Sequence, residues 1–111
     1  MQLNEEVLQL IAQRLKTMSE PARLRILQLL KDKELSVGEI ADRMNMKHGT
    51  ASANLNALAK VGLVTVRREG TKSLYRIGSD MVFKICDAVC DSLQDEFREM
   101  AKLEKAIRKR E

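Results

Sequence analysis

The chain has 111 residues, a length typical of one domain, and a formal net charge of +4 with an isoelectric point near 9.3. Aromatic residues make up only 3% of the sequence, so aliphatic side chains and six Met must supply the core. No apolar run approaches the about 18 residues of a membrane span, the first residues are acidic where a signal peptide is basic, and the two cysteines suit a reducing compartment. We therefore expect a cytoplasmic, single-domain protein (1–111) with no membrane partner.

Three helices are expected in the first part of the chain. Apolar residues recur at helical spacing over about residues 3–17. A second helix begins at Pro21, because proline suits the first helical turn, where its missing N–H has no partner to lose. A third begins after Ser36, which forms a capping-box pattern with Glu39.

A fourth helix and a β-hairpin follow. The fourth helix covers about residues 47–61 and ends before Gly62, with Leu55 and Leu58 on its inner face. Apolar and polar residues then alternate, and an EGTK turn leads into the segment SLYRI, which predicts a two-stranded hairpin. The outer face of the fourth helix carries small and polar side chains that would let the helix backbone approach base edges closely: Gly49, Ser52, Ala53, Asn56 and Lys60.

The last helix is expected over about residues 80–108. At 1.5 Å per residue it would be roughly 40 Å long, more than a small domain can cover. Its apolar stripe therefore needs a partner, and together with the helix at 3–17 it predicts a homodimer interface. The stripe consists of Val82, Ile85, Cys86, Val89, Cys90, Leu93, Phe97 and Met100.

Charge is distributed unevenly along the chain. Residues 43–76 contain seven basic side chains and one acid, Glu69, whereas residues 80–97 contain five acids and one base, Lys84. Four helices followed by a basic hairpin indicate a mainly α winged helix-turn-helix of order α-α-α-α-β-β-α, with a two-stranded hairpin as the wing. Its DNA-binding core would span about 19–78, and its N- and C-terminal helices would dimerise. This fold places one helix in a DNA major groove and the wing along the backbone.

Two groups of residues are the expected DNA contacts. Basic side chains of the turn and wing would bind phosphates, which gives affinity without sequence information; they are Lys47, Arg67, Arg68 and Lys72. The start and outer face of the fourth helix would meet the bases or approach them closely, through His48, Gly49, Thr50, Ser52, Ala53 and Asn56. The alternative is an ordinary solvated basic face. No enzyme and no small-molecule substrate are expected, because the single histidine, His48, has no catalytic partner beside it.

Residues 15–77 resemble the ArsR/SmtB family of prokaryotic repressors, through SEPARLRILQLL, ELSVGEIADRM, TASANLNALAKVGLV and REGTKSLYRI. The resemblance implies a homodimer that binds operator DNA and is released by a metal ion, a metalloid or a thiol-reactive signal. The family's two best-known metal sites are missing: its Cys-Val-Cys is replaced by Ser36-Val37-Gly38, and the last helix contains no histidine. Residues 47–54 also differ from the usual recognition sequence, so we expect a different operator.

Cys86 and Cys90 are the remaining candidate sensor. Four residues apart on a helix, they share one face. One interpretation is two small buried hydrophobic side chains; the other is a thiol sensor or a site for As(III), Hg(II), Cd(II) or Cu(I), with up to four thiols converging in a dimer. The resulting hypothesis is a homodimeric, sequence-specific DNA-binding transcriptional repressor. The alternative hypothesis is a winged-helix module for protein interaction or RNA binding without an operator.

Overall fold

The computed structural model describes residues 2–109 and divides into two compact units, one ending at Asp80 and one beginning at Met81. Within residues 2–109, no helix is both long enough and apolar enough to span a bilayer. That the two units make up one domain stays a prediction.

Four helices of the first unit form where the sequence signals place them. Asn4 caps the first helix, its side-chain oxygen accepting from the Val7 N–H at 2.9 Å. Pro21 opens the second. The predicted capping box is confirmed: Ser36 accepts from the Glu39 N–H at 3.2 Å, and the Glu39 carboxylate accepts from the Ser36 N–H at 3.0 Å. The helices are α1 (Glu5–Met18), α2 (Pro21–Leu29), α3 (Val37–Met44) and α4 (His48–Lys60).

The wing belongs to a three-stranded antiparallel sheet in the order β1-β3-β2, in which β1 is Leu35–Ser36, β2 is Val64–Glu69 and β3 is Lys72–Ile77. The predicted hairpin of β2 and β3 is confirmed, with Gly70 at φ 62° supplying the left-handed residue that its tight turn requires. Strand β1 is an addition to the predicted order, since a two-residue strand is too short to show alternation.

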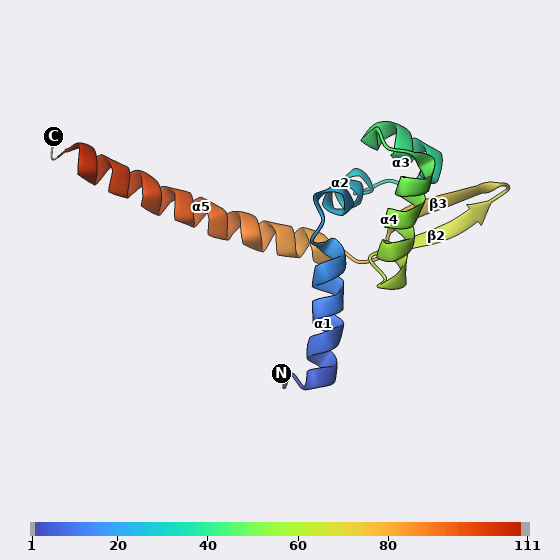
Figure 1. The fold of residues 1–111 in the computed structure, drawn as a ribbon, viewed down its shortest axis with the longest axis horizontal. Helices are drawn as coiled ribbons and strands as arrows, with labels where there is room; N and C mark the ends of the chain where they lie inside the picture. The colour runs from blue at the N-terminus through green and yellow to red at the C-terminus, as the bar shows by residue number, and fades with distance from the viewer. Residues whose placement is uncertain (1, 110–111) are drawn as a thin grey trace. The chain divides into compact units, whose positions relative to one another are not determined.

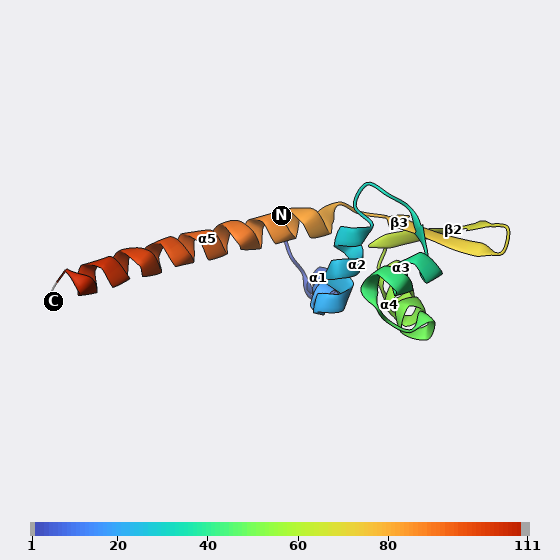
Figure 2. The ribbon, with the colours of Figure 1, turned by 90° about the horizontal axis from the view of Figure 1, so that it is seen from above.

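The core of the first unit lies where α2, α3, α4 and the base of the hairpin meet, and α3 and α4 lie on one side of the hairpin (Figure 2). The hairpin runs at an angle to α4, and its tip projects sideways away from the helix (Figure 1). Asn45, in the left-handed conformation, turns the chain between α3 and α4, and Gly62 at φ 77° follows α4. The fully buried large side chains here are Ile26, Leu27, Leu30, Ile40, Leu55, Leu58, Leu63 and Val64.

The second unit is a single continuous helix, α5 (Met81–Arg108), of 28 residues. This confirms the predicted helix over 80–108 to within a residue at its start. Its apolar stripe is exposed from Val89 onwards, at spacings of three and four residues: Val89, Leu93, Phe97, Met100, Leu103 and Ile107.

Candidate nucleic-acid interface

Helix α4 has one buried face and one exposed face. Ala51, Leu55 and Leu58 are buried, so the helix is anchored along one side and its opposite side is free. The predicted contact residues of this helix and its cap all reach the surface, with only Ser52 half-buried: Lys47, His48, Gly49, Thr50, Ser52, Ala53 and Asn56. Whether they contact DNA stays a prediction.

A groove joins the start of α4 to the wing. It has a volume of about 300 Å³ and is lined by Ser36, Val37, Gly38, His48, Thr71, Lys72 and Ser73. Two predicted contacts from distant parts of the sequence, His48 and Lys72, are therefore brought to one surface. Beside them, the backbone N–H of Ser36 holds the pKa of the Glu39 carboxyl below its usual value, so that acid stays charged as part of its cap.

The two wing arginines lie on opposite faces of the hairpin. Thr65 and Arg76 are paired across the strands, and the Arg76 Nε donates to the Thr65 Oγ1 at 3.2 Å, which marks one face. Strand alternation puts Arg67 on that face and Arg68 on the other, with the buried Tyr75. Because Tyr75 is buried, its face of the hairpin is the one turned toward the core, so Arg68 lies on the core side and Arg67 on the opposite side.

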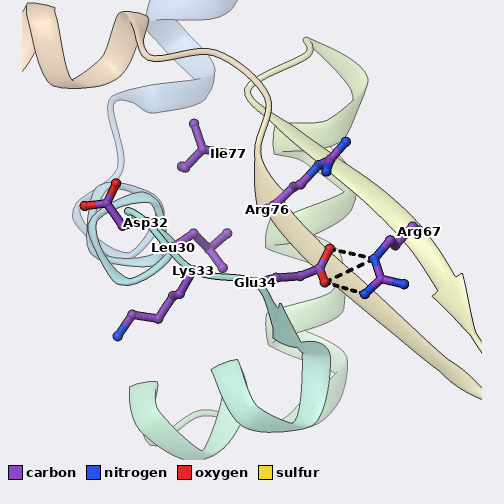
Figure 3. Close-up of a pocket in the computed structure, with 7 residues that line it drawn as sticks. All are labelled: Leu30, Asp32, Lys33, Glu34, Arg67, Arg76 and Ile77. Atoms are coloured by element: carbon purple, nitrogen blue, oxygen red, sulfur yellow. Dashed lines mark hydrogen bonds and ion pairs between the residues drawn. The ribbon is translucent and has the colours of Figure 1, made fainter.

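Arg67 is held by two acids. Its Nε donates to Glu34 Oε1 at 3.1 Å and Oε2 at 2.9 Å, and its Nη2 donates to Glu34 Oε1 at 2.7 Å (Figure 3). The same Nη2 lies 2.9 Å from Glu69 Oε2. These hydrogen bonds lower the pKa of Glu34 and raise that of Arg67. Arg67 was predicted as a phosphate contact from charge alone, and the structure gives it an internal ion pair as well.

A second polar connection ties α4 to the other helices. The Nε of Arg23, on α2, donates to Asn54 Oδ1 on α4 at 3.0 Å, and its Nη1 donates to the carbonyl of Thr17 on α1 at 3.2 Å. The Asn54 Nδ2 donates in turn to the carbonyl of Thr50 at 3.0 Å. Arg23 thus fixes the helix that carries the predicted base contacts.

Neither Arg23, Asn54 nor Glu34 was a predicted site residue. Arg23 lies in the PARLRIL motif, where an arginine among apolar helix positions was the only sequence feature that could have indicated a partly buried polar contact. Its partner is 31 residues away, as Glu34 is 33 residues from Arg67. One sequence contains no information on pairings over such separations.

Replacing Arg23 with Met is expected to lower the free energy of unfolding by about 1–3 kcal/mol, since the Asn54 and Thr17 oxygens lose their donor while the volume is roughly kept. Urea unfolding followed by circular dichroism measures the change. Arg25→Met, at an exposed position of the same helix, is the matched control and should change stability little. Equal effects of the two substitutions would show that Arg23 is an ordinary surface arginine.

The two cysteines lie in the second unit, on α5. Both are free thiols, Cys86 half-buried and Cys90 exposed. Among residues 2–109, no group of three or more His, Cys, Asp or Glu side chains is arranged to hold a metal ion. Whether the two thiols bind a metal ion stays a prediction.

Comparisons with known proteins agree with this architecture. Residues 18–67 match the model of a helix-turn-helix domain family. The chain is 46% identical over 70 residues to the HTH-type transcriptional regulator Rv0324 of Mycobacterium tuberculosis, covering 63% of this chain but only 31% of that protein. It is 35% identical over 75 residues to the biofilm growth-associated repressor of Agrobacterium fabrum, covering 68% of this chain and 64% of the repressor. The chain thus spans less than two-thirds of either relative.

A solved structure extends the similarity over most of the chain. It is the homodimeric winged helix-turn-helix DNA-binding domain, fragment 1–100, of a Mycobacterium bovis protein described as a possible ArsR-family transcriptional regulator. The TM-score is 0.70 at 39% sequence identity, and the match covers 86% of this chain and 90% of that fragment. The chain therefore belongs to the ArsR family of winged helix-turn-helix transcriptional regulators, as the order of its helices and wing, the helix-turn-helix match and this structural similarity together show.

Proposed function

We propose that this protein binds operator DNA as a homodimer and represses transcription from it. The observation that carries the proposal is the anchored helix α4, whose exposed face begins at a groove shared with the basic wing. A helix presented in this way fits a major groove, and a wing beside it fits the adjacent backbone. The biofilm growth-associated repressor of A. fabrum supports repression as the direction of regulation, and the transcriptional activator HlyU of Vibrio cholerae among the relatives makes activation the alternative outcome.

The homodimer is the second part of the proposal. Helix α1 exposes Leu8, Leu10, Ile11 and Leu15, and α5 exposes an apolar stripe over most of its length. Large side chains left in water on two helices favour burial against a second copy. The homodimeric relative from M. bovis supports this partner. Two-fold symmetry would then place two copies of α4 about one DNA turn apart, so the operator should be palindromic.

Fluorescence anisotropy with the protein's own promoter duplex tests the proposal. We expect a dissociation constant of about 10⁻⁸–10⁻¹¹ M at physiological salt, a steep decrease in affinity with salt, and much weaker binding to a scrambled duplex. Ser52→Ala should change which operator bases are preferred, since a hydroxyl on α4 can reach base edges. Binding that is equal for every duplex, or preferred for RNA, together with a monomer on size exclusion, would instead favour an interaction or RNA-binding module.

The signal is the third part. We propose that the thiols of Cys86 and Cys90 receive it, as ligands for As(III), Hg(II), Cd(II) or Cu(I) or as a thiol-reactive pair. The support is chemical: thiolates select soft ions, and the pair lies in the apolar stripe that we assign to the dimer interface.

A further inference from the structure

The ion pair of Arg67 and Glu34 joins the two outer strands of the sheet. Glu34 comes directly before β1, Arg67 lies in the middle of β2, and β3 lies between those strands. Figure 3 shows the carboxylate and the guanidinium pointing toward one another across β3. Two atoms of the guanidinium reach two carboxylate oxygens at 2.7–3.1 Å, a bidentate geometry that fixes orientation as well as distance. We call this pair the wing clamp.

Strand β1 is the short part of the connection between the wing and the helix-turn-helix, and the wing clamp lies next to it. Strand β1 is two residues long and pairs with β3 only through Leu35 with Tyr75 and Ser36 with Leu74. Ser36 is also the N-cap of α3, so any tilt of the wing relative to β1 is passed to the start of the helix-turn-helix. The clamp holds β2 to the residue that precedes this short strand.

Arg67 and Arg68 are neighbours in the sequence but have different surroundings, because they lie on opposite faces of the hairpin. Arg68 pairs with Ser73, a lining residue of the groove beside His48, and is exposed. Arg67 lies on the opposite face, beside a cavity of about 480 Å³ lined by Leu30, Asp32, Lys33, Glu34, Arg67, Arg76 and Ile77. The side chain of Arg67 is half exposed and that of Glu34 only 26% exposed, so the acid is the less accessible partner.

We infer that Arg67 is a positioning residue that sets the angle of the wing through Glu34, while Arg68 is the arginine that contacts DNA phosphate. The inference rests on the proposed binding to operator DNA. It differs from the simpler expectation that two adjacent wing arginines act alike. Basic residues near nucleic acid usually act by charge, whereas here one of the two acts through its fixed geometry.

Whether Glu34→Gln raises or lowers DNA affinity distinguishes a positioning role of Arg67 from a purely electrostatic one. Glu34→Gln removes a negative charge beside the basic wing, which by electrostatics alone should strengthen DNA binding. If Arg67 positions the wing, the same substitution weakens binding several-fold, because it removes the bidentate ion pair that holds β2 to the residue before β1. Asp32→Asn is the matched control: it removes the same charge beside the same cavity and leaves the clamp intact, so it should leave affinity unchanged or raise it slightly. Stronger binding by Glu34→Gln, equal to that of Asp32→Asn, would overturn the inference.

The salt dependence of binding provides a second test. Loss of one phosphate contact lowers the magnitude of the slope of log K against log salt by about 0.9. We expect that decrease for Arg68→Gln. The double variant Glu34→Gln/Arg67→Gln, which keeps the net charge, should lower affinity and leave the slope as in the wild type. A slope reduced by about 0.9 in the double variant would mean that Arg67 itself contacts phosphate.

A measurement without DNA tests the wing clamp independently of the proposed DNA binding. Amide hydrogen exchange of the β1–β3 ladder should be faster in Glu34→Gln than in the wild type or in Asp32→Asn. The assays belong at neutral pH: since the clamp lowers the pKa of Glu34 below 4.5, its stabilising effect is present above that pH and is lost as the pH falls through the folded-state pKa. If the wild type binds no duplex, the proposed function is wrong. The hydrogen-exchange rates then still show whether the wing clamp stabilises the β1–β3 ladder. Unchanged exchange at the ladder would refute the clamp even where DNA is bound.

Discussion

A variant carrying Leu93→Glu and Phe97→Glu is expected to be a monomer and to bind the operator about 10³-fold more weakly than the wild type, at the level of non-specific binding. The two side chains are 43% and 67% exposed in the single chain. If a second copy covers them, each new carboxylate is buried without a partner, and this cost prevents association. A monomer reads one half-site and loses the contribution of the other.

The remainder of the apolar stripe makes this pair of positions central. Val89 precedes it by one turn, and Met100 follows Phe97 at helical spacing, so the substitutions interrupt the stripe in its middle. Sedimentation equilibrium measures the oligomeric state, and anisotropy with the promoter duplex measures affinity. The two measurements should change together, because the dimer is required for two-site recognition.

Ala88→Glu/Gln94→Glu is the matched control. It adds the same two carboxylates to α5 in the rows of charged residues: Ala88 lies one turn from Lys84 and Asp91, and Gln94 lies one turn from Asp91 and Arg98. The control should remain dimeric and keep operator affinity within a few-fold. If the stripe variant stays dimeric, α5 is not the interface. If it is monomeric but binds as tightly as the wild type, two-fold recognition is wrong.

The parts of the fold that could be predicted from the sequence are those set by neighbouring residues. The capping box of Ser36 and Glu39, the first-turn Pro21 and the turn glycines Gly62 and Gly70 each act within a few residues, and the structure has all of them where they were expected. The exposed face of α4 follows from helical spacing in the same way. Period and capping are local physics, so a single sequence contains them.

The parts that could not be predicted depend on pairings between distant segments. Strand β1 exists because β3 offers two residues to pair with, and nothing in Leu35–Ser36 alone indicates it. The sequence gives no basis for distinguishing Arg67 from Arg68. Their different environments arise from strand alternation and from Glu34, which precedes β1. Charge counting therefore located the wing correctly but could not assign a role to each cation.

In the presence of arsenite or Cd(II), the wild type is expected to lose at least tenfold in operator affinity, which corresponds to about 1.4 kcal/mol of coupling between ion and DNA. Cys86→Ser/Cys90→Ser should bind DNA as the wild type does and fail to respond. The thiols are free, and Cys90 is exposed, so ions can reach at least one of them. An ion bound in the apolar stripe would favour a different packing of the two α5 helices, and DNA affinity changes only by the difference in ion affinity between the two packings.

The experiment compares arsenite, Cd(II), Hg(II), Cu(I), polysulfide and peroxide in separate anisotropy titrations, with near-ultraviolet thiolate–metal absorption recorded alongside. Two thiols per copy leave a trigonal or tetrahedral site short of ligands, so we expect one ion per dimer, with thiols from both copies. The single variants Cys86→Ser and Cys90→Ser should each weaken ion binding, because a shared site loses two ligands at once. Ion binding without any change in DNA affinity would make the pair a binding site with no regulatory role. A double variant that still responds would show that the signal enters elsewhere and that these cysteines serve the packing of α5.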